Sequence, residues 1–385
     1  MLKRRDFMVA AVLAGGGLAS GFSARISGAA EPARAAAANK LNDDSQKKYD
    51  QAVAKAISYL TSKARAADGS YNAPAGPGIT ALVVTGMLRH GVSPDDPRIA
   101  KSLKYLESFV QPDGGVYGKD SFYKNYETCL SILCFTAANE GGRYDKLLKT
   151  ANAFIKDTQW DESEQKPRDD TFYGGAGYGR SKRPDLSNTT FLVDALKANT
   201  TEDNKDAIAK ALVFVSRCQN LETEHNTTPF AAKNPDGGFY YTPAGGGNSQ
   251  AGTDEKTGGL RSYASMTYAG LKSMIYAGVK SDDPRVKAAA TWARKHYSLK
   301  ENPGMGAAGL YYYYHTFAKA LSALGEDRFA DEAGVQHDWR AELIAELAAR
   351  QREDGAWVNE NAKWLEGDAS MCTGFALLAL SYCGK

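Results

Sequence analysis

The chain has 385 residues, of which 43% are hydrophobic and 24% are charged, a composition typical of a globular protein with ample material for a core. Its 47 Lys and Arg nearly balance 45 Asp and Glu, so the formal net charge is only +2. This balance argues against the strongly basic surface of a nucleic-acid-binding domain, and no nucleic-acid partner is expected.

The N-terminal segment has the layout of an export signal. Arg4 and Arg5 form a twin-arginine pair, a weakly apolar stretch covers 9–18, and small residues continue to Ala38. Residues 1–38 are therefore predicted to be a Tat signal peptide, with the Tat translocase as a partner during export and a periplasmic or other extracytoplasmic destination. The apolar stretch is shorter than the ~20 residues of a membrane-spanning helix, and no transmembrane segment is expected after the signal is removed.

A glycine-containing turn recurs through the rest of the chain. Two copies read Pro-Asp-Gly-Gly-Val-Tyr at 112–117 and Pro-Asp-Gly-Gly-Phe-Tyr at 235–240. Around them, amphipathic patterns with apolar residues at i, i+3, i+4 and i+7 alternate with segments that are apolar on most sides, which is typical of a buried helix. Further copies of the turn lie at 67–71, 173–178, 303–306 and 353–357, and the apolar segments include 79–90, 126–139, 263–277, 310–324 and 369–383.

Each repeat is predicted to consist of an outer half-exposed helix, a glycine turn and an inner buried helix. One such unit cannot bury its own inner helix, so its neighbours must cover it. Six units with inner helices this apolar favour a closed ring over an open solenoid. The predicted fold is all-α, an (α/α)6 toroid or barrel of six helix hairpins over residues 47–385, with 160–186 and 221–260 as loops at its mouth.

The Asp-Gly-Gly-aromatic turn between two helices resembles the repeats of the squalene-cyclase and protein-prenyltransferase β-subunit family. Residues 349–357 are a near variant of the cyclase pattern Gln-x-x-x-Asp-Gly-x-Trp, and 263–278 and 304–324 look like bacterial exported proteins described as squalene-cyclase-like. The resemblance implies a terpenoid-cyclase-like toroid with an apolar central cavity. The Asp-x-Asp-Asp acid of the cyclases and the Asp-x-Cys zinc pair of the prenyltransferases are both absent, so neither a reaction, a metal nor a cofactor is carried over.

Polar residues at the starts of the inner helices form the candidate site. In a closed ring these starts are expected to point at the central cavity, where their free N–H groups and dipoles favour an anion. The polar residues can be helix caps alone, or caps that also line a site, and both interpretations stay open. Glu127 is the candidate acid because burial raises a carboxyl pKa, Asp368 would stay ionised as a base or cation stabiliser, and His315 could move protons.

The predicted substrate-binding side chains are mostly aromatic. Four consecutive tyrosines at 311–314 cannot share one helix face, so at most two are expected to face the cavity. Aromatic faces stabilise cations and also stack on sugar rings, so they do not separate an isoprenoid from a glycan. The predicted set is Tyr263, Tyr268, Tyr311, Tyr314, Asn188, Trp364 and Arg261.

Three functions are compatible with these residues. The first is a cyclase-like or transferase-like enzyme that acts by acid/base chemistry on a lipid-like or other small molecule in the central cavity. The second is a carbohydrate-active (α/α)6 hydrolase or lyase with Glu127, Asp368 or Asp194 as its carboxylates. The third is a non-catalytic binding or scaffold toroid, in which the centre of the ring is filled.

Overall fold

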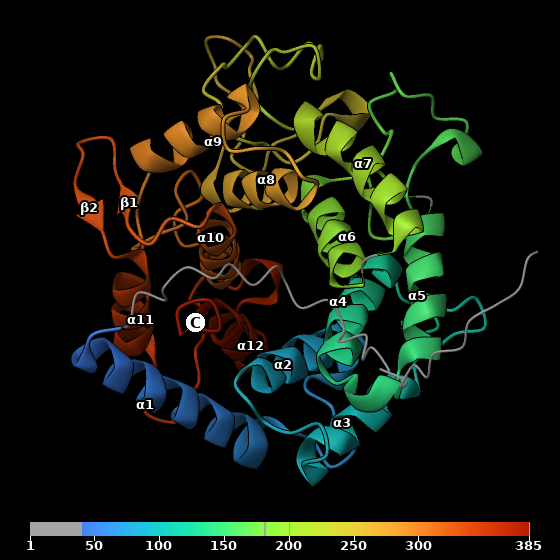
Figure 1. Cartoon of the computed structure of the whole chain (residues 1–385), viewed down its shortest axis with the longest axis vertical. Helices are drawn as coiled ribbons and strands as arrows, with labels where there is room; N and C mark the ends of the chain where they lie inside the picture. Colours follow the sequence, from blue (N-terminus) through green and yellow to red (C-terminus); the bar gives the residue numbers. More distant parts are fainter. Residues whose placement is uncertain (1–40, 181, 200, 385) are drawn as a thin grey trace, which may run out of the picture.

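Two concentric layers of α-helices make up the described part of the chain, which is residues 41–180, 182–199 and 201–384 of the computed structural model (Figure 1). The predicted signal peptide lies outside the described residues. The outer helices are α1 (Asp43–Tyr59), α3 (Pro97–Glu107), α5 (Asp145–Asp157), α7 (Glu202–Arg217), α9 (Pro284–Lys295) and α11 (Trp339–Arg350). The inner helices are α2 (Pro77–Arg89), α4 (Lys124–Ala137), α6 (Leu186–Ala198), α8 (Ala264–Tyr276), α10 (Leu310–Leu324) and α12 (Ala369–Leu380).

The inner helices form a closed ring. Contacts run from α2 to α4, α6, α8, α10 and α12 in turn, and α12 packs back against α2. On the outside, α1 contacts α11, so the first and last hairpins lie side by side (Figure 1). The predicted (α/α)6 toroid is therefore confirmed. A short antiparallel hairpin of β1 (Phe329–Ala330) and β2 (Gln336–His337) lies between α10 and α11.

Outer helices begin at caps that the sequence encodes. Asp96 accepts a hydrogen bond from the backbone N–H of Arg98 and precedes the proline that starts α3. Asp283 does the same for α9, with Arg285 as the donor. Asp before Pro is a strong helix-start signal, because Asp satisfies a free N–H and Pro lacks one. These aspartates are therefore capping residues.

A threonine near the start of an inner helix fixes the glycine turn that precedes it. The backbone N–H of Val116 donates to the hydroxyl of Thr128 at 3.0 Å, for example. Because this bond recurs around the ring, it sets the height at which the inner helices begin relative to their turns. The other pairs are Tyr71 with Thr80, Ala176 with Thr189, Phe239 with Thr267, and Trp357 with Thr373.

The first glycine of the turn packs against the backbone of the following outer helix. Gly114 has a φ of +89°, and a Cβ there would lie 2.8 Å from a carbonyl oxygen of α5. Only glycine tolerates both the conformation and the contact. Gly69 and Gly237 meet α3 and α9 in the same way, and Gly355 meets Lys55 of α1. The last turn therefore closes the ring onto the first helix.

The core lies between the two layers and inside the inner ring. All five cysteines are buried and unpaired, and they pack as small apolar side chains. Among the helices of the described segments, none has the length and apolar character needed to cross a membrane.

Candidate active site

A cavity of about 250 Å³ occupies the end of the ring at which the inner helices begin. It is lined by the first turns of all six inner helices and by the loops before them. Tyr123, Trp364 and Leu365 line it and are also 40–55% exposed, so the cavity opens to solvent beside them. The other lining residues are Ala75, Gly78, Ile79, Tyr126, Glu127, Tyr178, Ser187, Phe191, Tyr241, Gln250, Tyr263, Ser265, Met266, Gly309, Tyr312, Glu366, Met371 and Phe375.

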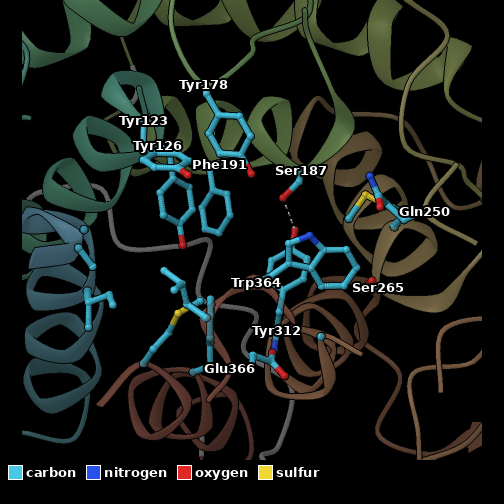
Figure 2. Close-up of a pocket in the computed structure, with 18 of the residues that line it drawn as sticks. Tyr123, Tyr126, Tyr178, Ser187, Phe191, Gln250, Ser265, Tyr312, Trp364 and Glu366 are labelled. Atoms are coloured by element: carbon cyan, nitrogen blue, oxygen red, sulfur yellow. Dashed lines mark hydrogen bonds between the residues drawn. The ribbon is translucent and has the colours of Figure 1, made fainter. Parts of the chain in front are cut away.

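Aromatic rings dominate the walls of this chamber. Six Tyr, two Phe and one Trp lie among the 21 lining residues. A continuous run of ring contacts crosses four inner helices, because Tyr126 meets Phe191 at 5.0 Å, Phe191 meets Tyr312 at 6.0 Å, and Tyr312 meets Phe375 at 5.7 Å. Figure 2 shows Tyr126, Phe191 and Tyr178 on one side of the space, with Tyr312 and Trp364 across from them. The result is a wide apolar surface with few polar atoms.

Glu127 is a buried acid of the chamber wall. It lies in the first turn of α4 and is 3% exposed, and burial raises the pKa of its carboxyl. One oxygen, Oε2, accepts a hydrogen bond from the backbone N–H of Gly118 at 3.1 Å. The other, Oε1, lies against Gly76, where a Cβ would overlap it. A glycine at this position with a φ of +81° thus makes room for the carboxylate.

Glu366 is a second acid of the lining, and the sequence had not indicated it. The carboxylate is 1% exposed and caps α10: Oε1 accepts from the backbone N–H of Tyr312 at 2.8 Å, and Oε2 accepts from the Asn359 amide at 2.6 Å. Burial raises its pKa, and these donors oppose the increase. Because both oxygens are occupied, Glu366 is less suited than Glu127 to give up a proton to a substrate.

Asp185 is a third buried acid, directly behind the lining. It caps α6 by accepting hydrogen bonds from the backbone N–H and the side-chain amide of Asn188 at 2.9 and 2.8 Å. Burial raises the pKa of Asp185 to about 6, while the bonds from Asn188 and an interaction with the Tyr241 hydroxyl act in the opposite direction. Tyr241 itself lines the chamber, so it connects Asp185 with the chamber surface.

His315 lies below the chamber and does not line it. It borders a separate small cavity with Arg89 and Lys319, and Phe191 lies between the two spaces. Burial and the Lys319 ammonium hold the pKa of His315 well below its usual range, so the imidazole is neutral. Its Nδ1 has no hydrogen-bond partner among the described residues. The structure thus separates His315 from Glu127, with which the sequence had grouped it.

The tyrosine run on α10 presents only Tyr312 to the chamber. Tyr311 and Tyr314, which were predicted to face it, lie outside the lining, and the Tyr314 hydroxyl donates to the Leu299 carbonyl at 2.7 Å. The side of α10 that faces the ring centre carries Tyr312, His315 and Lys319, at i, i+3 and i+7. The buried ion pair of Lys319 with Asp194 fixes this rotation of the helix, which tyrosine spacing alone does not reveal.

The remaining predicted residues divide between the wall and its surroundings. Tyr263 and Trp364 line the chamber, whereas Tyr268 is buried against Phe317, with ring centres 5.1 Å apart. Asp368 caps α12 and also accepts from the Asn72 amide at 2.9 Å, so both of its oxygens are bonded, and it is not a lining residue. Asn188 supports Asp185, as described above, and the Arg261 side chain is exposed outside the lining.

The two long loops at the mouth contribute directly to the chamber, as their predicted position implies. Tyr178 comes from the first loop, and Tyr241 and Gln250 come from the second.

A closed α/α ring whose inner helices begin at an aromatic, acid-bearing chamber defines the class as a terpenoid-cyclase-like toroid. Residues 49–243, half of the chain, match the squalene-hopene cyclase C-terminal domain family, and the chain belongs to this family.

Solved structures of several enzymes share the fold. The type II terpene cyclase MstE from Scytonema, in complex with its substrate geranylgeranyl dihydroxybenzoate, superposes with a TM-score of 0.54 and 13% identity, covering 89% of this chain and 99% of that one. A polysaccharide lyase superposes with a TM-score of 0.51 and 10% identity, covering 88% of this chain and 97% of that one. A family 76 glycoside hydrolase from a bovine Bacteroides thetaiotaomicron strain superposes with a TM-score of 0.51 and 12% identity, covering 86% of this chain and 77% of that one. At these identities the likeness concerns the fold alone. No curated protein matches the chain significantly.

Proposed function

We propose that this chain is a terpene-cyclase-like enzyme that binds an apolar substrate in the central chamber and protonates it from Glu127. The observation that carries the proposal is the position of Glu127, a buried carboxyl with a raised pKa in a wall that carries nine aromatic rings. A raised pKa keeps the proton on the acid closer to neutral pH, and a developing positive charge on the substrate would face aromatic rings. Family membership supports the same class of chemistry.

Glu127→Gln tests the catalytic part of the proposal. We expect a loss of turnover of at least about 100-fold, the usual contribution of a general acid, with little change in melting temperature because the substitution preserves shape. In the wild type, turnover should fall as pH rises through the raised pKa of Glu127, since the proton is then lost. Substrates would be identified by mass spectrometry of the ligand released from the purified chain and then supplied to both variants. Full activity in Glu127→Gln would remove this acid from the mechanism.

A carbohydrate-active toroid is the competing function, because a lyase and a glycoside hydrolase share the fold. The chamber offers two lining carboxyls, Glu127 and Glu366, but Glu366 has both oxygens occupied as a helix cap. A glycosidase of the common type needs two available carboxyls. Cell-wall glycans should therefore be included in the same ligand screen, and their recovery in place of a lipid would favour this alternative.

We further propose that residues 1–38 direct the chain through the Tat pathway to the periplasm or another extracytoplasmic compartment. The proposal rests on the pair Arg4 and Arg5 and on the short apolar stretch that follows them. Replacing both arginines with lysine should retain the chain in the cytoplasmic fraction of cells. Unchanged export of that variant would contradict the Tat route.

A further inference from the structure

Among the residues that the structure describes, the chamber combines acids and aromatic rings with no basic side chain. None of its 21 lining residues is Lys, Arg or His. We propose that the chamber selects an apolar molecule carrying a positive charge, such as an alkyl or terpenoid ammonium, and rejects the same skeleton bearing a carboxylate or phosphate. The inference rests on the proposed function only in taking the chamber as the ligand site.

The chain's own carboxylates occupy the N-termini of three of the six inner helices, where an anion could otherwise bind. Glu366 accepts from the first turn of α10, Asp185 from that of α6, and Asp368 from that of α12. In α8, the N–H of Ser265 donates to the Asn302 side chain at 3.1 Å. In α6, α10 and α12 the dipole that would favour an anionic ligand is therefore offset by a carboxylate before any ligand binds.

Three lysines around the chamber are engaged with other groups. Below Phe191, Lys272 and Lys319 form ion pairs with Asp194 at 2.5 and 3.0 Å. At the mouth, the Lys363 ammonium lies over the Trp364 ring, 4.4 Å from its centre, and is not part of the lining. An anion inside the chamber would thus meet Glu127 and Glu366, which repel it whenever they are ionised, and no described lining residue supplies a cation to offset that repulsion.

A cation would instead meet favourable groups on several sides. The nine aromatic rings present faces and edges around the space, and ring faces attract a cation through their quadrupole. The buried carboxyls add charge attraction whenever they are ionised, and this attraction is strong because the walls are apolar. Both effects act on a permanent charge, so they can be measured without knowing the reaction.

Three probes with the same ten-carbon chain test the inference by isothermal titration calorimetry at pH 8. These are decyltrimethylammonium, decanol and decanoate. We expect the ammonium to bind at least about tenfold more tightly than decanol, and decanoate to bind more weakly than decanol. Glu127→Gln should reduce the advantage of the ammonium, whereas Glu360→Gln, an exposed carboxyl outside the lining, should leave it unchanged.

A cation placed in the wall should reverse the selectivity. Gln250 is a partly exposed lining residue, so Gln250→Lys introduces an ammonium without disturbing the core, and it should raise decanoate affinity and lower that of decyltrimethylammonium. Wild-type binding of decanoate as tight as that of the ammonium would overturn the inference and leave the proposed function standing. Failure of all three probes to bind would overturn both. Retained turnover in Glu127→Gln, together with the expected ammonium preference of the wild type and its reduction in the variant, would overturn the proposed function alone.

Discussion

Individual carboxyl groups in this toroid differ in role because their surroundings differ. Glu127 and Asp368 both come from inner-helix starts, yet Glu127 faces the chamber while Asp368 is bonded to Asn72 and to its own helix. The sequence identified Glu127 because this residue lies in the first turn of a segment predicted to be a buried helix. Glu366 and Asp185 were missed because the sequence does not show the paths of the loops that hold them: Glu366 follows a short turn at 363–365 and caps α10, and Asp185 ends the loop before α6.

The raised pKa of Asp185 predicts a pH-dependent contribution to stability. The folded-state pKa of about 6 exceeds the ordinary value of 3.8, so the stabilisation due to its proton is complete below pH 3.8 and is lost as pH rises through about 6. Asp185→Asn keeps an oxygen to cap α6 and carries no charge. In urea unfolding, the free energy of the variant relative to the wild type should therefore increase by about 3 kcal/mol between pH 3.5 and pH 7.5. Asp282→Asn, at an exposed position, is the control, and its free energy of unfolding should change with pH as that of the wild type does. If the free energy of unfolding of Asp185→Asn also changed with pH as in the wild type, the raised pKa of Asp185 would be contradicted.

The inner helices have fixed rotations, and these rotations determine which side chains reach the chamber. Threonine bonds to the preceding turns fix one end of each of five helices, as between Thr267 and Phe239. Near the other end, Asp194 of α6 pairs with Lys272 of α8 and Lys319 of α10, and all three side chains are no more than 5% exposed. Turning α8 or α10 would leave a buried charge unpaired, which typically costs about 3–5 kcal/mol. This is why Tyr312 faces the chamber while its neighbours in the run do not.

Closure of the ring depends on the contact between the last turn and the first helix. Gly355 has a φ of +93°, a Cβ there would overlap the Lys55 carbonyl oxygen, and the Gln351 amide beside it donates to the Ala52 carbonyl at 2.9 Å. These contacts join segments about 300 residues apart in the chain. They hold α11 against α1, and with it the final inner helix in the wall of the chamber.

Gly355→Ala should lower the stability of the protein more than the same substitution at a glycine that has a similar positive φ but no neighbouring atoms. Gly91 is the matched control, with a φ of +81° and no atom within 4 Å of the position that a Cβ would take. We expect Gly355→Ala to lower the free energy of unfolding by about 1–3 kcal/mol beyond the loss in Gly91→Ala, because it adds the overlap with α1. Urea denaturation of both variants measures the difference. Equal losses would mean that this contact does not hold the ring closed.

The sequence by itself determined the repeat, the helix-start signals at Asp96 and Asp283, the alternation of outer and inner helices, and hence the toroid and its family. These features are local, since caps, turns and apolar periodicity are set by neighbouring residues. Only the tertiary structure decided which acids converge on the chamber and which tyrosine of the run 311–314 lines it. These outcomes depend on the rotation of each inner helix and on the paths of the long loops, which also bring in Tyr178 and Tyr241. That no described residue of the wall is basic likewise emerges only when distant segments of the chain meet in one place.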